Sequence, residues 1–369
     1  MVGAPRFVTE LPGRRRGLLA LLLLVWLPSP GAAGPLVTVR DGRPLMGTLL
    51  QLTLVSDDEA RARVAAEACF ALGAELEAVL TTYDPASATS RLNASAGAGP
   101  FQAPPALARM LADSKRLSAA TGGVFDPTVG PLIELWTQAG RTGRLPSAAA
   151  IATAKSRVGA ERIVLGPDGM VALEPGMRVN FGGVGKGFAL DRMREGLAEH
   201  GVSRALLDFG GSSWLALGAP AGEPTWRVLL RDGRGGFAGV VSLRDASVSF
   251  SESFGEASEI EGKRYGHVID PRTGWPIREP VAGVALASDG ATAEALTKAL
   301  VVLAPPEGLA VVARTPGAEA LVIDAAGALH ESPGFRAATA FEPASRRGGA
   351  AAPRSKRSAQ RGVAERSHE

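Results

Sequence analysis

The sequence predicts an α+β fold in which a mixed β-sheet packs against helices. Residues 36–40 and 48–55 alternate apolar and polar side chains, as paired strands do. Over 58–80, and again over 292–303, Ala, Leu and Val recur at helical spacing. Because the chain has 369 residues and no internal repeat, its length suits one large domain or two ordinary ones.

In the first half of the chain, turn and cap residues mark the boundaries of the expected helices and strands. Asp57 and Asp58 are expected to cap the long helix, because a carboxylate accepts hydrogen bonds from the first helical N–H groups. The other expected elements of this half are a tight link at 46–48, a helix from Pro104-Pro105 to about Thr121, a helical turn over 133–137 that carries Trp136, and a hairpin over 163–173 around Pro167-Asp168-Gly169.

The second half alternates strands with helices. Phe188 to His200 is amphipathic and predicts a helix. The elements expected after it are a buried strand at 205–209, three strands of a meander at 226–230, 239–243 and 246–251, a strand and turn over 267–276, a strand at 281–287, the helix at 292–303, a short helix at 307–314, and strands at 320–323 and near Leu329.

The stretch from Val179 to Asp191 places glycines and Lys186 between a strand end and a helix. Glycine lets the backbone approach a ligand closely, and the N–H groups of a first helical turn favour an anion such as a pyrophosphate. Lys186 would add a mobile positive charge beside the phosphates. The spacing fits neither G-x-G-x-x-G nor G-x-x-x-x-G-K-[ST], so a plain glycine turn before a packed helix is the alternative.

The N-terminal segment has the three parts of a secretory signal peptide. Arg14-Arg15-Arg16 precede an apolar run of about 11 residues, which is too short for a comfortable membrane span. Small residues follow, so cleavage is expected near Ala33 and residues 1–33 are assigned to the signal. The single cysteine, Cys69, excludes an internal disulfide and is expected to be a buried apolar residue.

The positive charges gather at the two ends of the chain. The formal net charge is +3, yet the body between the arginine-rich N-terminus and residues 343–369 is mildly acidic. A nucleic-acid-binding core is therefore not predicted. Residues 343–369 are rich in Arg, Ala, Gly and Ser, and we expect them to form a disordered basic tail.

Several short segments share a resemblance to one family and occur in its order. They are Met46-Gly47-Thr48, Thr82-Tyr83-Asp84 with Ser90-Arg91-Leu92-Asn93, Gly123 to Leu132, Asn180 to Asp191, Asp208-Phe209-Gly210-Gly211, His267 to Gly274, and Ala293 to Leu300. Together they resemble the ApbE family, the FAD:protein FMN transferases. Each segment alone is modest, but so many in register are hard to obtain by chance. The resemblance implies a single ApbE-like domain over 35–342 with the family's α+β fold.

The resemblance also implies an activity and a site. The family members bind FAD and Mg²⁺, break the FAD pyrophosphate and leave FMN on a Ser or Thr hydroxyl of a partner flavoprotein. His267 falls where a base for the hydroxyl proton has been proposed, and an imidazole of near-neutral pKa suits that task. The residues that would line the FAD site are Met46, Tyr83, Val124, Phe125, Asp126, Asn180, Lys186 and Val268. The positions at which the family holds its metal are the carbonyl of Gly183 and the side chains of Glu294, Thr297 and Lys298.

Four departures from the family pattern gather on the phosphate and metal side. Asn180 and Glu294 each replace an Asp, and Glu252 replaces a glycine. Lys298 replaces a Thr, and a protonated amine offers Mg²⁺ no lone pair and repels it. Either Lys298 supplies positive charge against the pyrophosphate, or it pairs with Glu294 or Glu252 and leaves a binder without transfer. Our hypothesis is that dependence on Mg²⁺ is weakened.

Three functions are open on this basis. The first is FMN transfer to a flavoprotein of respiration or electron transfer, by an exported protein that is periplasmic or associated with the inner membrane through its partner. The second is an FAD pyrophosphatase, which uses water as acceptor and releases FMN and AMP. The third is a noncatalytic FAD-binding protein, motivated by the four departures. Neither paired catalytic carboxylates nor a Ser-His-Asp set stands out, so a sugar or phosphate hydrolase is not indicated.

Overall fold

A computed structural model describes residues 35–344. The expected signal peptide at 1–33 and residues 345–369 of the expected tail lie outside this range, so both stay predictions. Within 35–344, no helix is both long enough and apolar enough to cross a membrane. Helices and antiparallel sheets build this part of the chain, which confirms the predicted α+β class.

An eight-stranded antiparallel sheet carries the fold. In spatial order its strands are β1 (Val37–Leu45), β2 (Thr48–Ser56), β6 (Arg204–Phe209), β7 (Ser213–Leu217), β10 (Ala246–Glu252), β15 (Ala282–Ala287), β16 (Glu319–Ile323) and β17 (Leu329–Glu331). The tight link between β1 and β2 is a two-residue turn, in which Met46 and Gly47 have φ values of 48° and 73°. Positive φ at both positions matches the twist of the strands but places Met46 in a region that non-glycine residues rarely occupy.

Both faces of this sheet are covered by apolar side chains. On β6, Ala205, Leu207 and Phe209 are buried on one face, whereas Leu206 packs on the other. All six residues of β15 are buried. Successive side chains of a strand point to opposite faces, so a strand that is buried on both faces shows a continuous apolar run. This accounts for the apolar run at 205–209.

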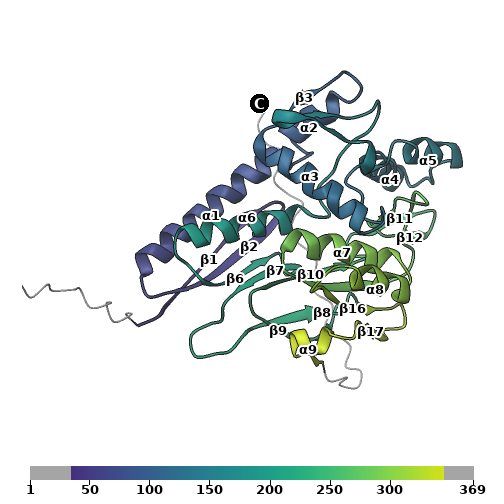
Figure 1. The fold of residues 1–369 in the computed structure, drawn as a ribbon. Coiled ribbons are helices and arrows are strands. Elements are labelled where there is room, and N and C mark those ends of the chain that lie inside the picture. Colours follow the sequence, from purple (N-terminus) through teal and green to yellow (C-terminus); the bar gives the residue numbers. More distant parts are fainter. Residues whose placement is uncertain (1–34, 345–369) are drawn as a thin grey trace, which may run out of the picture. The chain divides into compact units, whose positions relative to one another are not determined.

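Helices cover one face of the sheet (Figure 1). α1 (Glu59–Leu80) lies on β1 and β2, α6 (Gly185–Glu199) on β7 and α1, and α7 (Gly290–Val302) on β10 and β15. The other helices are α2 (Ala88–Ala94), α3 (Pro105–Ala120), α4 (Gly130–Thr142), α5 (Ala148–Lys155), α8 (Pro305–Ala313) and α9 (Phe335–Thr339). Every residue of α7 is buried except Lys298 and Val302. A charged group on such a helix needs internal partners.

A three-stranded sheet covers the opposite face. It consists of β8 (Trp226–Arg231), β9 (Phe237–Leu243) and β18 (Glu342–Pro343), and it shares an apolar core with the large sheet around Trp214 and Phe250. The predicted meander is therefore wrong in one respect, because β10 pairs with β7 and β15 instead of β9. β7 has no counterpart among the predicted strands.

The remaining strands form three small sheets. They are β3 (Phe101–Gln102) with β4 (Val164–Leu165) and β5 (Met170–Ala172), β11 (Ser258–Ile260) with β12 (Lys263–Tyr265), and β13 (Ile269–Asp270) with β14 (Trp275–Pro276). The pairing of β4 with β5 confirms the hairpin predicted around 167–169.

Two helices test the predicted boundaries. On α1, Asp58 Oδ1 accepts a hydrogen bond from the N–H of Arg61 at 3.0 Å, which confirms the predicted cap. Cys69 of α1 is buried as expected, and burial raises the pKa of its thiol to about 12. The predicted turn around Trp136 is the full helix α4, because Gly143, with φ of 66°, ends the helix only after Thr142.

α6 and α7 touch through two glycines. A Cβ added to Gly187 would lie 2.2 Å from the carbonyl oxygen of Gly290, and one added to Gly290 would lie 2.6 Å from that of Gly187. α6 begins at Gly185, three residues before the predicted start. Within the glycine stretch, Gly187 is thus required by backbone contact between two helices rather than by room for a ligand.

Asp191 joins the same two helices and should make stability depend on pH. Its buried carboxylate accepts hydrogen bonds from the N–H groups of Gly290 (2.7 Å) and Ala291 (3.0 Å), and burial raises its pKa to about 6 despite them. The folded state therefore binds this proton more tightly than the unfolded chain, in which Asp titrates near ~3.9. Because protons favour the folded state, the free energy of unfolding should fall by up to about 3 kcal/mol as pH rises from about 4 to about 6.

Urea unfolding of the wild type and of Asp191→Asn across this pH range measures the effect of Asp191. The variant has no carboxylate to titrate at this position, so the difference in unfolding free energy between the two proteins should change with pH. A difference that is constant over the range would contradict the raised pKa.

Candidate active site

A cluster of polar side chains lies where α6 begins beside α7, and we call it the Glu294 cluster. Its members come from the start of α6, the link between β6 and β7, the first residue of β7, the end of β10, and α7. They are Lys186, Ser212, Ser213, Ser251, Glu294, Thr297 and Lys298. Segments that are distant in the sequence thus share one charged site, which includes four of the residues expected from the family pattern.

Glu294 is the buried centre of this cluster. Only 3% of it is exposed, and its carboxylate accepts hydrogen bonds from Ser213 Oγ at 2.6 Å and from the N–H of Gly187 at 3.0 Å. Lys186 Nζ lies 3.8 Å from the same carboxylate and donates to Ser212 Oγ at 2.5 Å. The start of a helix attracts an anion. At α6 that anion is a side chain of the protein itself, with Lys186 as its counter-ion.

Lys298 enters the cluster from one turn further along α7. Its Nζ donates hydrogen bonds to Ser251 Oγ (2.8 Å), to Thr297 Oγ1 (3.1 Å) and to the carbonyl oxygen of Glu294 (3.3 Å). In the part of the chain that the structure describes, no carboxylate forms an ion pair with this amine. Of the two alternatives for Lys298, the pairing with Glu294 or Glu252 is not found, because Glu294 directs its carboxylate to α6 and Glu252 lies near Gly233 and Gly255.

Burial and neighbouring charges set the protonation of the cationic groups. Burial lowers the pKa of Lys298 to about 8, while the charge of Glu294 opposes this and that of Lys186 adds to it. Since the pKa stays above 7, the ammonium form prevails at neutral pH.

His267 is an electrostatic neighbour of Lys298. Burial of the ring among protein atoms lowers the pKa of His267, and the charge of Lys298 lowers it further, while Glu256 has the opposite effect. The residue nevertheless keeps an exposed surface. Its Nδ1 accepts a long hydrogen bond of 3.4 Å from the N–H of Glu256. A neutral imidazole at an exposed position is able to accept a proton from an incoming hydroxyl.

Three further residues expected to hold FAD or metal lie around the cluster. A Cβ added to Gly183 would be 3.2 Å from Lys298 Cε and 3.7 Å from Phe125 Cε2, so Gly183 lies against the lysine stem and Phe125 lies beside Gly183. Asn180 belongs to the same turn, where its Oδ1 accepts a hydrogen bond from the N–H of Gly182 at 2.9 Å. An aspartate can form this turn equally well, so the turn does not require the amide.

Four other expected FAD residues have no hydrogen bond or ion pair to the cluster within 35–344. Tyr83 is 96% exposed, so its ring is accessible but the fold does not fix it. Met46 is partly buried in the β1–β2 turn. Val124 and Val268 are buried, the former in an apolar core with residues of α7 and α8.

Asp126 and Asp270 hold their own loops. The buried carboxylate of Asp126 accepts hydrogen bonds from the N–H and Oγ1 of Thr128 (2.7 and 2.5 Å) and from the N–H of Ala160 (3.0 Å). Burial raises the pKa of Asp126, although these bonds oppose the shift. Asp270 forms a salt bridge with Arg272, with 2.9 Å between Oδ2 and Nη2, and so holds its own turn.

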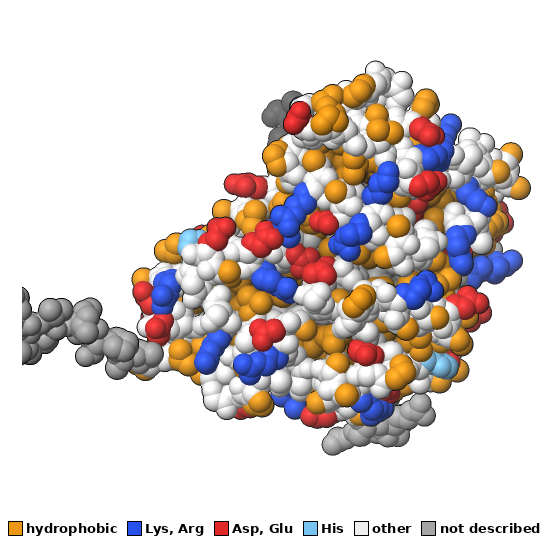
Figure 2. Space-filling model, viewed as in Figure 1, with side chains coloured by type: hydrophobic (Ala, Val, Ile, Leu, Met, Phe, Trp, Pro, Cys, Tyr) orange, Lys and Arg blue, Asp and Glu red, His pale blue; other side chains and the backbone are white. Residues whose placement is uncertain are grey.

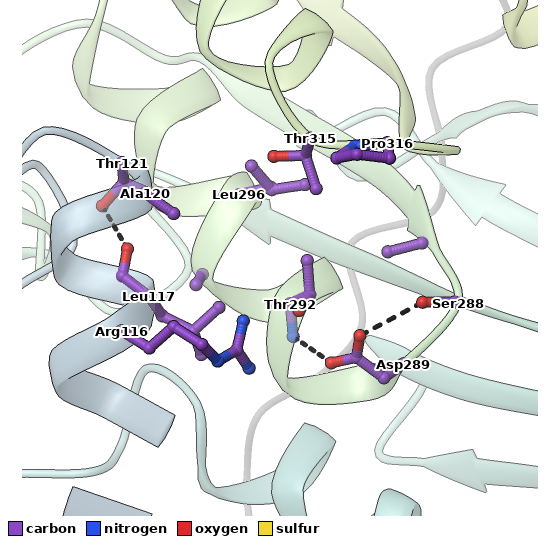
Figure 3. Close-up of a pocket in the computed structure, with 12 residues that line it drawn as sticks. Arg116, Leu117, Ala120, Thr121, Ser288, Asp289, Thr292, Leu296, Thr315 and Pro316 are labelled. Carbon is purple, nitrogen blue, oxygen red and sulfur yellow. Dashed lines mark hydrogen bonds between the residues drawn. The ribbon is translucent and has the colours of Figure 1, made fainter. Parts of the chain in front are cut away.

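The pocket drawn in Figure 3 lies at the start of α7, and no residue of the cluster lines it. It has a volume of about 160 Å³ and contains the cap of α7, where the N–H of Thr292 donates to Asp289 Oδ1 at 2.8 Å. The residues that line it come from α3, α7 and the segment after α8, and include Leu117, Thr121, Asp289, Thr292, Leu296 and Thr315. Ligand pockets usually measure about 300–1,000 Å³. Since the pocket is small and contains no expected site residue, the Glu294 cluster is the better candidate.

The charges on the face drawn in Figure 2 do not point to another site. On the face drawn in Figure 2, Lys and Arg side chains are interspersed with Asp and Glu. A mixed surface of this kind produces no extended field of one sign that would attract a polyanion.

Comparison with known proteins identifies the family. A model of the ApbE family matches residues 46–322, a range that contains the whole Glu294 cluster and His267. The chain belongs to the ApbE family. A relative from Klebsiella pneumoniae (strain 342), named FAD:protein FMN transferase, is 32% identical over 298 residues, which are 77% of this chain and 83% of that protein. A relative of the same name from Treponema pallidum (strain Nichols) is 30% identical over 325 residues, or 82% and 90% of the two chains.

Solved ApbE structures share the fold. The crystal structure of the ApbE protein from Thermotoga maritima matches with a TM-score of 0.74 and 26% identity, over 82% of this chain and 99% of that one. The apo form of the flavinyl transferase ApbE from Pseudomonas stutzeri matches with a TM-score of 0.72 and 26% identity, over 82% and 96%. The arrangement of helices and antiparallel sheets is therefore that of ApbE proteins.

The residues of this ApbE chain do not fit a magnesium ion. Among residues 35–344, no three His, Cys, Asp or Glu side chains gather as metal ligands. Thr297 Oγ1 is engaged by Lys298 Nζ and Ser251 Oγ, and the Glu294 carboxylate is engaged by α6. Mg²⁺ requires oxygen atoms at about 2.0–2.1 Å and repels an ammonium group. The positions expected for the metal hold the side chain of Lys298 instead.

Three members of this ApbE site are not predicted from the sequence. Ser212, Ser213 and Ser251 supply hydroxyl groups to Lys186, Glu294 and Lys298, but none stands in a charged motif. The sequence feature that could have indicated these serines is their position. Two of them follow the glycines at 210–211, and the third lies near the end of a buried strand. Hydroxyl groups at such strand ends are well placed to satisfy buried charges.

Proposed function

We propose that this chain is an FAD:protein FMN transferase, which moves FMN from FAD to a Ser or Thr hydroxyl of a partner flavoprotein and releases AMP. The observation that supports it most is the Glu294 cluster of a chain of the ApbE family, which contains Lys186 and Lys298 and in which the charge of Lys298 helps to lower the pKa of His267. Relatives of about 30% identity that cover most of the chain carry the name of this activity.

In the proposed reaction the acceptor hydroxyl oxygen bonds to the phosphorus of the FMN half. The bond from that phosphorus to the bridging oxygen breaks, and AMP leaves with that oxygen. His267 takes the hydroxyl proton at Nδ1, where the proton replaces the long hydrogen bond from Glu256. Lys186 and Lys298 stabilise the charge on the phosphates, as phosphoryl transfer requires.

The surroundings of FAD and the place of reaction belong to the same proposal. Phe125, Asn180 and Tyr83 would extend the FAD site from the cluster, since Phe125 lies beside Gly183 and Tyr83 is exposed to an incoming ring. Glu294 is a positioning residue, because it holds Lys186. The signal-like residues 1–33 support export and a periplasmic or membrane-associated partner.

His267→Ala should lower the rate of FMN transfer by about 10²–10⁴-fold, because a positioned general base contributes about that much. The protein is incubated with FAD and a target fragment that bears an acceptor Thr, and flavin fluorescence is measured on the denatured target. Since the pKa of His267 is lowered, the wild-type rate should stay high at pH values somewhat below the usual ~6.5 of histidine and fall only at lower pH.

His200→Ala is the matched control, because His200 ends α6 and has no place in the cluster. Its transfer rate should equal that of the wild type. A fluorescent target supports the transferase. Free FMN and AMP with an unlabelled target would contradict the transferase and indicate the pyrophosphatase. Unchanged FAD would indicate the noncatalytic binder.

A further inference from the structure

The amine of Lys298 has a partner for each of its hydrogen atoms. An ammonium group has three N–H donors, and the three acceptors here are Ser251 Oγ, Thr297 Oγ1 and the carbonyl oxygen of Glu294. All three are uncharged oxygens. The amine is thus fixed as a cation within the site rather than neutralised by direct pairing with a carboxylate.

The stem of Lys298 occupies the rest of the same space. A Cβ on Gly183 would lie 3.2 Å from Lys298 Cε, so the backbone of Gly183 closes on the side chain. Gly183, Glu294 and Thr297 are the other positions expected to hold a metal. Lys298 therefore lies against all three of these positions, at the backbone of Gly183, the carbonyl of Glu294 and the hydroxyl of Thr297.

We propose that the Lys298 ammonium is a resident cation that takes the place of Mg²⁺ in this site, so that the protein binds FAD without a divalent ion. This inference rests on the FAD site proposed above. The cluster contains two lysines and one carboxylate. Glu252, at the end of β10, lies near Gly233 and Gly255 and is not part of it. A divalent ion added here would meet two positive charges and only one negative charge, at distances where repulsion is strong.

Binding of Mn²⁺, a spectroscopic substitute for Mg²⁺, tests the proposal without measuring catalysis. The full-length protein is treated with EDTA, freed of chelator and titrated with Mn²⁺, with and without FAD, while electron paramagnetic resonance reports free Mn²⁺. The wild type should leave Mn²⁺ free at stoichiometric concentration. Lys298→Thr, which restores the family residue, should bind one Mn²⁺ at least ~100-fold more tightly, because a repelling charge is removed.

FAD affinity provides the second measurement. The dissociation constant of the wild type for FAD should change by less than about twofold between EDTA and excess Mg²⁺, since uncoupled ligands leave each other's affinity unchanged. Lys298→Met removes the charge without adding a ligand, so its FAD affinity should fall and Mg²⁺ should not restore it. In Lys298→Thr, Mg²⁺ should restore FAD affinity. Lys263→Thr, on the exposed part of β12, is the control and should behave as the wild type.

The outcomes separate this inference from the proposed function. One tightly bound Mn²⁺ in the wild type would overturn the inference, and so would a folded Lys298→Thr that gains no Mn²⁺. If Lys298→Thr does not fold, as judged by circular dichroism, the wild-type titration and Lys298→Met still decide, because Mg²⁺-dependent FAD binding by either would also overturn it. A wild type that meets these expectations but labels no target would contradict the transferase alone.

Discussion

Gly187→Ala is expected to lower the free energy of unfolding by about 3 kcal/mol or more, because overfilled cores lose about 1–3 kcal/mol and sometimes more. The added methyl group would lie 2.2 Å from the oxygen and 2.4 Å from the carbonyl carbon of Gly290. These are backbone atoms of a helix that is buried along almost its whole length, so neither helix can move aside without disturbing the sheet. Urea unfolding followed by circular dichroism measures the loss.

Gly196→Ala, in the same helix, is the matched control. A Cβ at this position meets no atom within 4 Å, so the substitution should stabilise the protein by about 0.5–1 kcal/mol through helix propensity. The close approach of α6 and α7 would be contradicted if Gly187→Ala and Gly196→Ala had the same effect.

Glu294→Ala should have a comparable effect on stability and should also abolish FMN transfer. It leaves the N–H of Gly187 and the hydroxyl of Ser213 without their buried acceptor, and Lys186 without its counter-ion. Removal of one partner from a buried charged group typically costs about 3–5 kcal/mol. Unfolding free energy and target labelling are measured on the same preparation.

Two further variants serve as controls for Glu294→Ala. Glu294→Gln keeps an oxygen acceptor and nearly the same volume, so it should recover part of the stability, whereas loss of the negative charge that holds Lys186 should keep transfer low. Glu75→Ala, at an exposed position of α1, should stay within about 0.5 kcal/mol of the wild type. If Glu294→Ala were as stable as the wild type, the carboxylate of Glu294 would not anchor α6 and β7 to α7.

Local signals in the sequence predict the elements that depend on local chemistry. Asp58 caps α1 and the turn at 167–169 forms a hairpin because a few adjacent residues determine both. The choice of partners for β10 depends on which apolar faces meet across the whole fold. Its apolar run suits a meander with β9 as well as the central sheet, so the sequence could not decide between them.

The same difference between local and long-range interactions applies to the site. The family pattern brought Lys186, Glu294 and His267 to attention, and the structure places two of them in ion-pair distance. The pairing of Glu294 with Lys298, one of the two alternatives considered for this lysine, follows a rule for exposed helix surfaces. On a buried helix, the N–H of Gly187 and the hydroxyl of Ser213 compete for the carboxylate, and such long-range partners have no signature in the spacing of residues along one helix.

The burial of α7 determines how the site responds to a substrate. Since this helix packs in the core, its amide hydrogens should exchange with solvent only in large unfolding events, and the groups that it carries are ordered before any ligand arrives. FAD would then bind without the entropy loss of arranging Glu294, Thr297 and Lys298. The same rigidity joins two properties that many enzymes vary separately. A substitution on α7 that changes which substrate is accepted also changes the packing of β10 and β15, so new specificity at this helix can arise only together with a change in global stability.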